Sequence, residues 1–325
     1  MGNGLKPPEL KEGILGYNRS ITGGSHLSNL TLLAIFKNES HILSEWIDSH
    51  AAEGVDKFIL VNNNSSDDFE SAIGSARYAS RVTLLHDSIT HRQSYIYNTA
   101  FNSHIQGSDT EWLLVCDLDE FVYARNGFAT ITDYLRTVPK DVSCIALPWK
   151  LYGSSGFDKH PETGVVSNFT YRDDYEPKGD GKIMNGMCSP GWMYSKYIAR
   201  ISQIINLQVH KATLKSGRLL LPDGNNGTPD SDFQRITEDS LKNYNLHINH
   251  YVIQSREFFE RVKMTRGAPN DAAQDSIRDW NYFAKHDTNL ILDDELARKR
   301  QAAVPTGPSP YALGEPAIQA RTNPS

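Results

Sequence analysis

The sequence predicts an α/β protein with a mostly parallel β-sheet that helices cover on both faces. In residues 30–120, apolar segments of strand length alternate with segments that have helical periodicity. The strand segments are apolar throughout, which is typical of strands buried on both faces. After about residue 140 the segments become shorter and Gly-rich loops separate them, which predicts a smaller mixed β region that completes the same domain.

Four strands and three helices are expected in the first half. The predicted strands cover residues 30–36, 57–63, 81–87 and 112–120. The predicted helices cover residues 40–54, 65–79 and 91–105. Gly54 stands where a helix C-terminus favours left-handed backbone, and Ser and Asp residues open the second helix at positions typical of helix starts.

The second half is expected to contain short strands followed by two helices. The predicted strands lie within residues 144–156, 164–172, 195–205 and 245–253, and the helices within 255–267 and 276–286. Residues 1–28 predict a flexible arm and 301–325 a disordered tail, because both are rich in Gly, Pro or Ser and lack periodicity. A single domain is therefore expected over residues 29–300, with halves at about 29–140 and 141–300.

The composition argues against several classes of function. The chain has 325 residues and a net charge of −6, with basic and acidic residues well mixed, so a nucleic-acid partner is not expected. The three cysteines are far apart and predict reduced thiols. Residues 1–30 hold no long apolar run, so we expect a cytoplasmic protein without a signal peptide or a transmembrane segment.

Polar clusters follow three of the predicted strands. They are Lys37-Asn38-Glu39, the run at 62–68, and Asp117-Leu118-Asp119-Glu120. Because the carboxyl ends of parallel strands meet at one edge of a sheet, where ligands bind, we expect these clusters to lie together.

The stretch "WLLVCDLDEF" carries the strongest signal for chemistry. If the strand continues to its end, its period of two places Asp117 and Asp119 on the same side. Two such carboxylates can hold Mg²⁺ or Mn²⁺ together with phosphate oxygens. One alternative is a solvated acidic loop. Another is a haloacid-dehalogenase-like phosphohydrolase, in which the first Asp is a nucleophile.

Four segments resemble, in order, the nucleotide-sugar glycosyltransferases of the GT-A fold, and more narrowly their family 2-like and family 92-like group. They are "LLAIFKNESHILSEWIDSHAAEGVDKFILVNNNSSDD", "WLLVCDLDEF", "LPWKLYGSSG" and "INHYVIQSREFFERVKMTRG". They cover most of residues 30–267. The resemblance implies a Rossmann-like GT-A domain with a donor half and an acceptor half. It also implies transfer of a sugar from a nucleotide-diphosphate donor, with UDP-sugars favoured, to a glycan or glycoconjugate hydroxyl.

The resemblance also implies roles for particular residues. A Mn²⁺ or Mg²⁺ ion would be held by Asp117 and Asp119, with His250 or His210 as a third ligand. The expected nucleotide-sugar contacts are Ala34, Phe36, Asn38, Glu39, Asn62, Asp67, Arg92, Gln93, Asp117, Leu118, Arg256 and Lys263. Arg256 and Lys263 are seven residues apart, which places them on one helix face that is either a diphosphate site or simply a solvated basic face.

An inverting reaction, which is the expected stereochemistry, needs a carboxylate base near the acceptor. The catalytic candidates are Asp119, Asp158, Asp174 and Glu238. Trp149 and Tyr152 are candidates for an acceptor platform, with core packing as the alternative for Trp149. A non-catalytic nucleotide-sugar-binding module on the same fold is the remaining alternative.

Overall fold

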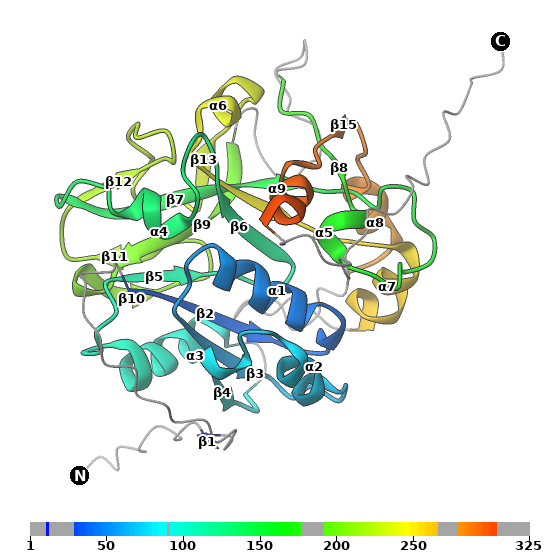
Figure 1. Cartoon of the computed structure of the whole chain (residues 1–325), viewed down its shortest axis with the longest axis horizontal. Coiled ribbons are helices and arrows are strands. Elements are labelled where there is room, and N and C mark those ends of the chain that lie inside the picture. Colours follow the sequence, from blue (N-terminus) through cyan, green and yellow to red (C-terminus); the bar gives the residue numbers. More distant parts are fainter. Residues whose placement is uncertain (1–10, 13–28, 90–91, 177–191, 266–277, 304–325) are drawn as a thin grey trace.

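The computed structural model describes residues 11–12, 29–89, 92–176, 192–265 and 278–303 (Figure 1). Four strands form the parallel part of the large sheet, in the order β4-β3-β2-β5. Their bounds are β2 Leu30–Phe36, β3 Lys57–Asn62, β4 Val82–His86 and β5 Trp112–Val115. A two-residue strand, β1 (Lys11–Glu12), pairs antiparallel with β4 at the outer edge.

Strands of the second half, together with β6 of the first half, extend this sheet beyond β5 in the order β9-β7-β14-β6, with β12 beside β7 and β13 beside β9. The bounds are β6 Glu120–Ala124, β7 Val142–Leu151, β9 Trp192–Arg200, β12 Arg218–Leu220, β13 Phe233–Arg235 and β14 Leu246–His250. The smaller pairs are β10 (Ile204–Leu207) with β11 (Ala212–Leu214), and β8 (Tyr171–Arg172) with β15 (Ile291–Leu292).

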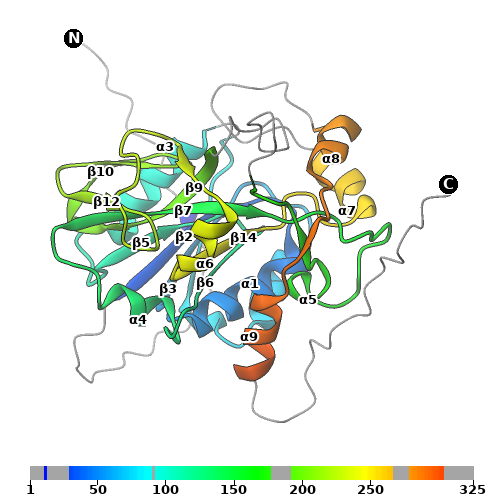
Figure 2. The same ribbon diagram turned by 90° about the horizontal axis from the view of Figure 1, so that it is seen from above.

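Helices lie on both sides of the sheet (Figure 2). Their bounds are α1 Ser40–Ala52, α2 Phe69–Ser75, α3 Gln93–Ala100, α4 Ile131–Leu135, α5 Val165–Asn168, α6 Glu238–Asn243, α7 Arg256–Arg261, α8 Trp280–His286 and α9 Glu295–Ala303. Alternate residues of β2 enter two separate cores: Leu32 packs with the residues of α1, and Leu33 with those of α3. This burial on both faces confirms the predicted α/β architecture.

Several predicted elements differ from the structure: the strand expected at 195–205 is divided between β9 and β10, the helix expected at 65–79 covers only Phe69–Ser75, and three further differences are larger. The strand expected at 112–120 ends at Val115, so Asp117 and Asp119 lie in the turn before β6. The strand expected at 164–172 is the helix α5 followed by the short β8. The helix expected at 255–267 ends at Arg261, and a 3₁₀ turn follows at Lys263–Thr265, so Arg256 and Lys263 do not share a helix face. The predicted N-terminal arm, apart from β1, and the tail beyond Ala303 lie outside the described residues.

Strand alternation gives the second half two chemically different faces. The register of β7, β9, β14 and β6 places Trp149, Lys196, His250 and Glu120 on one face. Lys150, the neighbour of Trp149 along β7, is on the opposite face. The first face borders the turn that holds Asp117 and Asp119, while the second carries a buried ionic network.

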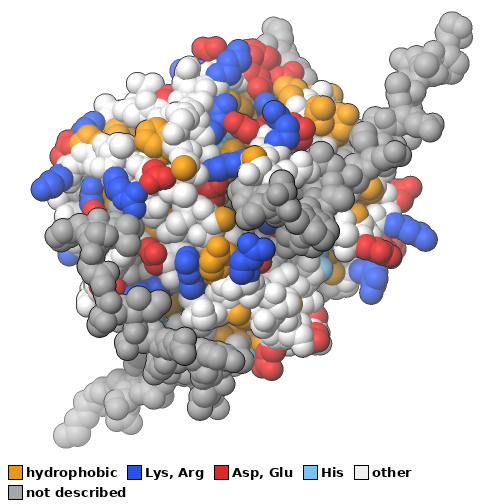
Figure 3. All heavy atoms as spheres, in the orientation of Figure 1, with side chains coloured by type: hydrophobic (Ala, Val, Ile, Leu, Met, Phe, Trp, Pro, Cys, Tyr) orange, Lys and Arg blue, Asp and Glu red, His pale blue; other side chains and the backbone are white. Residues whose placement is uncertain are grey.

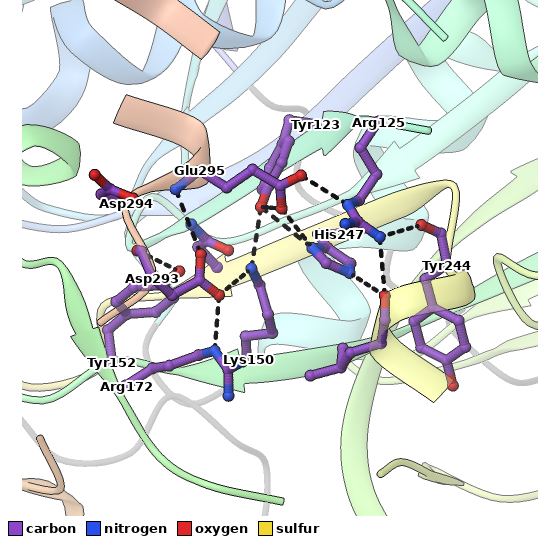
Figure 4. Close-up of polar contacts among 12 residues, drawn as sticks. Tyr123, Arg125, Lys150, Tyr152, Arg172, Tyr244, His247, Asp293, Asp294 and Glu295 are labelled. Atoms are coloured by element: carbon purple, nitrogen blue, oxygen red, sulfur yellow. Dashed lines mark hydrogen bonds and ion pairs between the residues drawn. The ribbon is translucent and has the colours of Figure 1, made fainter. Parts of the chain in front are cut away.

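That network fixes the C-terminal segment against the sheet (Figure 4). Asp293 accepts hydrogen bonds from Lys150 at 2.8 Å and from Arg172 at 2.7 Å. Glu295, at the start of α9, accepts from Tyr123 at 3.0 Å and from Arg125 at 2.8 Å. Because Lys150 is fully buried, these contacts hold the segment that ends the described chain in one position.

The surface charges, the cysteines and the helices are the features on which the composition gave predictions. On the face shown in Figure 3, basic and acidic side chains are interspersed. Cys116 and Cys144 are buried free thiols, and Cys188 lies outside the described residues. None of the helices in the described ranges has both the length and the apolar character needed to cross a bilayer.

Candidate active site

Helix α1 positions the turn that contains Asp117 and Asp119. The indole Nε1–H of Trp46 donates to the carbonyl oxygen of Glu120 at 2.8 Å and to that of Asp117 at 3.1 Å. One helical turn later, Nε2 of His50 accepts the N–H of Val122 at 3.1 Å, so its Nδ1 carries the proton and donates to the Trp46 carbonyl at 2.9 Å. Burial lowers the pKa of His50 to about 3, so this imidazole is neutral.

Asp117 forms an ion pair with a lysine from the second half of the chain. Its Oδ2 lies 2.8 Å from Nζ of Lys196, and its Oδ1 accepts from Tyr97 at 3.1 Å and from Gln93 at 3.3 Å. The Lys196 side chain is fully buried, whereas that of Asp117 is 30% exposed. Burial alone would raise the pKa of Asp117, but the positive charge of Lys196 outweighs it, and the pKa is lowered.

Asp119 lies deeper and contacts two cationic or potentially cationic groups. Its Oδ2 is 2.6 Å from Nζ of Lys263, and its Oδ1 is 3.4 Å from Nε2 of His250. Lys263 also lies 3.5 Å from Glu39, which follows β2. Although burial raises the pKa of Asp119, Lys263 and His250 together hold it well below its ordinary value.

The predicted strand-end clusters therefore meet at one edge of the sheet. Glu39 after β2 is linked to Asp119 through Lys263, and Asn38 is linked to the loop after β3. The Oδ1 of Asn38 accepts the N–H of Ser66 at 2.7 Å, and Asp67 accepts the N–H of Ser40, at the start of α1, at 2.7 Å. Asn38 adopts a φ of 54°, a left-handed conformation that Asn tolerates better than most residues.

The two predicted histidine ligands flank Trp149. The ring of Trp149 lies 4.2 Å from that of His250 and 5.3 Å from that of His210, measured between centroids. Burial, followed by the charge of Lys196, lowers the pKa of His210 to about 4, so His210 is neutral and chemically able to bind a metal. The described ranges nevertheless contain no preformed group of three or more His, Cys, Asp or Glu side chains in a metal-binding arrangement.

The remaining predicted nucleotide contacts fall into three groups. Ala34, Phe36 and Leu118 are buried in the core. Asn62 accepts the N–H of Ser65 and contacts His86, which orders the loop after β3. Arg92 is exposed at the start of α3, and the guanidinium of Arg256 lies over the ring of Trp280, 4.3 Å from its centroid.

The structure separates the other candidate residues. Glu238 makes a bidentate ion pair with Arg172, at 2.6 and 2.8 Å. Asp158 is exposed, and half-buried Asp174 accepts the N–H of Glu176. Tyr152, the predicted partner of Trp149, is fully buried on the opposite face, where its hydroxyl donates to the Asp293 carbonyl.

Lys196 is the principal residue that the sequence reading missed. It lies in "WMYSKYIAR", where a lysine interrupts an otherwise buried strand, and that position is the signal that could have found it. Tyr97, whose hydroxyl contacts Asp117, was also missed because it lies on a helix face that otherwise reads as core.

Comparison with known proteins assigns this α/β chain to a class. The family model of glycosyltransferase family 92 matches residues 33–290, so the chain belongs to glycosyltransferase family 92. This confirms the family predicted from the four segments.

The curated relatives are distant and longer. A glycosyltransferase family 92 protein of Oryza sativa subsp. japonica is 27% identical over 162 residues, which cover 48% of this chain and 26% of the relative. One from Ricinus communis is 23% identical over 154 residues, 46% of this chain and 27% of the relative. The matched region thus spans about a quarter of each relative.

Solved structures also match at low similarity. The mannosyltransferase PcManGT from Pyrobaculum calidifontis, in complex with GDP-Man and Mn²⁺, is 13% identical with a TM-score of 0.36, covering 62% of this chain and 55% of that one. S. aureus TarS 1–349 in complex with UDP is 13% identical with a TM-score of 0.37, covering 64% and 60%. The family assignment rests on the family model and not on these matches.

Proposed function

We propose that this protein transfers a sugar from a nucleotide-diphosphate donor to a hydroxyl of a glycan or glycoconjugate. The observation that carries the proposal is the convergence of Asp117, Asp119, Lys196, Lys263 and His250 at the carboxyl edge of the parallel strands. In open α/β sheets this edge is where nucleotides bind. Family membership supports the same class of reaction.

The two buried lysines suit the leaving group of this reaction. The acceptor hydroxyl oxygen attacks the anomeric carbon and gives its proton to a carboxylate base, the bond from that carbon to the diphosphate breaks, and the diphosphate takes the electron pair. Lys196 and Lys263 place two ammonium groups at the edge where that charge would develop. Gln93, which already donates to Asp117, is a further donor at the same edge.

A divalent cation fits the donor set of this cluster. Asp117, Asp119 and His250 supply two carboxylates and an imidazole, which suit Mn²⁺ or Mg²⁺, and the diphosphate would complete the coordination. Nδ1 of His250 is buried with no hydrogen-bond partner among the described residues, while Nε2 lies 3.4 Å from the Asp119 carboxylate, which can only accept. A cation could bind Nε2 once the ring proton moves to Nδ1. A bound cation would offset negative charge on the leaving diphosphate.

The decisive experiment measures nucleotide binding by thermal shift, with UDP, GDP and their sugars, with and without Mn²⁺. A ligand at a hundred times its Kd stabilises the folded state by about 2.7 kcal/mol, enough to move Tm by several degrees. We expect metal-dependent stabilisation by one nucleotide, with UDP first among the donors to test. If no nucleotide stabilises the wild type, the proposal fails, and p-nitrophenyl phosphate then tests the phosphohydrolase alternative.

The matched control removes the Asp117–Lys196 pair together. Asp117→Ala alone would leave Lys196 buried without its nearest carboxylate, so lost binding could reflect a damaged fold. Asp117→Asn combined with Lys196→Met avoids that charge imbalance. Turnover of the donor, with NMR of the product's anomeric configuration, then separates an enzyme from a binding module and tests the proposed inversion. A cytoplasmic location stays a prediction.

A further inference from the structure

Four aromatic rings, which we call the aromatic wall, continue from the candidate active site along the second half of the sheet. They are Trp149 of β7, Tyr194 of β9, Phe233 of β13 and His210 of the β10–β11 loop. Their centroids lie 5.3 Å apart for Trp149 and His210, 4.7 Å for His210 and Tyr194, and 4.0 Å for Tyr194 and Phe233. The rings therefore form an unbroken series.

The aromatic wall begins at the carboxylates of the site. Trp149 contacts His250, whose Nε2 lies 3.4 Å from Asp119. At the next ring, Nδ1 of His210 lies 3.2 Å from the carbonyl oxygen of Ser195, the residue before Lys196. A molecule that lies along the wall would thus have one end next to His250 and Asp119.

Buried polar atoms at the start of the wall lack partners. Trp149 is only 6% exposed, and its Nε1–H has no hydrogen-bond partner among the described residues; the same is true of Nδ1 of His250. A buried group left without a hydrogen bond costs about 1–3 kcal/mol, so such groups need an explanation. A ligand hydroxyl would satisfy either atom.

The far end of the wall remains partly open and carries a carboxylate. Tyr194, His210 and Phe233 are half-buried, and Asp232 precedes Phe233 with 39% of its side chain exposed. Nζ of Lys211 lies 3.4 Å from Oδ1 of Asp232. Aromatic faces beside a carboxylate offer stacking and directional hydrogen bonds at the same place.

We propose that the aromatic wall is the acceptor subsite and that it binds a pyranose ring of the acceptor glycan. The apolar C–H face of the sugar stacks on Tyr194 and Phe233, and its hydroxyls bond to Nε1 of Trp149 and to the carboxylate of Asp232. This inference rests on the proposed function and deepens it. It replaces Tyr152, which lies on the opposite face, with Tyr194 and Phe233 as the partners of Trp149.

Saturation-transfer NMR tests the subsite directly. The probes are methyl β-D-galactopyranoside, methyl β-D-glucopyranoside and methyl α-D-mannopyranoside, each with the wild-type chain in the presence of UDP and diamagnetic Mg²⁺. We expect transfer to the protons of one sugar face for at least one probe. Tyr194→Ala and Phe233→Ala should each weaken that binding about five- to tenfold, the loss expected for one aromatic contact.

Three variants keep the test specific. Tyr194→Phe should retain binding because the ring remains, and Asp232→Asn should weaken it because the amide is a poorer acceptor. Tyr78→Ala, which removes a half-buried tyrosine packed under Arg81 elsewhere in the fold, should change nothing. Circular dichroism confirms that each variant is folded.

Several results would overturn the subsite. Absence of transfer to all three probes in the wild type would do so, as would unchanged binding in both alanine variants. Transfer only to the sugar of an intact UDP-sugar, lost in Tyr194→Ala and Phe233→Ala, would mean that the wall holds the donor. Stabilisation by UDP, measured on the same variants, is expected to stay unchanged, so a failure of nucleotide binding in the wild type would count against the proposed function separately.

Discussion

The Asp117–Lys196 pair gives an asymmetric prediction for stability. Lys196 is fully buried and has Asp117 at 2.8 Å, with Glu120 more distant at 3.8 Å. Burial raises the pKa of Glu120 well above its ordinary value, so Asp117 is the main counter-charge. Asp117, by contrast, is 30% exposed and keeps its contacts with Tyr97 and Gln93 when the lysine is removed.

The magnitudes follow from this difference in burial. Breaking a buried pair by removing one partner costs about 3–5 kcal/mol, and we expect Asp117→Asn to fall at the lower end, about 3 kcal/mol, because Glu120 can ionise in its place. Lys196→Met should cost about 1 kcal/mol, because the remaining carboxylate is hydrated. The double variant should lie within about 1 kcal/mol of the wild type, since no charge is left unpaired.

Urea unfolding at neutral pH, followed by fluorescence and circular dichroism, measures the four free energies of this cycle. The reasoning would be refuted if Asp117→Asn were as stable as the wild type, or if adding Lys196→Met destabilised it further. The result also has a functional use. If the Lys196→Met variant still binds nucleotide with Mn²⁺ and the folded double variant does not, Asp117 can be assigned as a metal ligand.

Three further predictions concern stability. The pKa of His50 is lowered to about 3, below its value in the unfolded chain. The stability that the neutral imidazole contributes is fully present above about pH 6.5, and it should be lost towards pH 3 at about 1.4 kcal/mol per pH unit. His50→Gln should flatten this dependence of the unfolding free energy on pH, measured by urea titration, and an unchanged slope would contradict the prediction. Gly54 has a φ of 92°, and an added Cβ would collide with the side chain of Thr132. Gly54→Ala should therefore lower the free energy of unfolding by at least about 1 kcal/mol, measured by thermal unfolding. Adding Thr132→Ala should recover only the part of that loss that comes from the collision, because the left-handed backbone strain remains. Asp293→Asn should cost about 3–5 kcal/mol because Lys150 is buried, and a loss below 1 kcal/mol would show that the network in Figure 4 is not needed to hold the C-terminal segment.

Much of the first half could be predicted from local pattern. The run at Leu30–Phe36 is continuous and apolar, and it forms the predicted strand with the predicted bounds. Asp68 accepts the N–H of Ser71 at the start of α2, as its position at a helix start predicts. The second half was predicted less well because its strands are short. A pattern of a few residues does not distinguish the helix α5 from a strand, since packing against neighbouring elements decides between them.

The candidate active site was also predicted only in part from the sequence. The Asp-x-Asp carboxylates at the end of a buried strand, and their meeting with the cluster that holds Asn38 and Glu39, were predicted because strand ends of a parallel sheet meet at one edge. The turn that carries the two carboxylates was not predicted, since a strand was expected to continue to residue 120. Lys196 was not predicted either, because an isolated lysine has no sequence pattern that identifies its partner.

The sequence by itself determined the α/β class, the family and the strand ends where the carboxylates lie. Only the tertiary structure decided which charge faces each candidate carboxylate: Lys196 faces Asp117, Lys263 and His250 face Asp119, and Arg172 faces Glu238. It also decided that Trp149 lies near Tyr194 and not near Tyr152. The physical reason is that burial and strand alternation are local properties, whereas the partner of a buried charge depends on the register between strands distant in the chain.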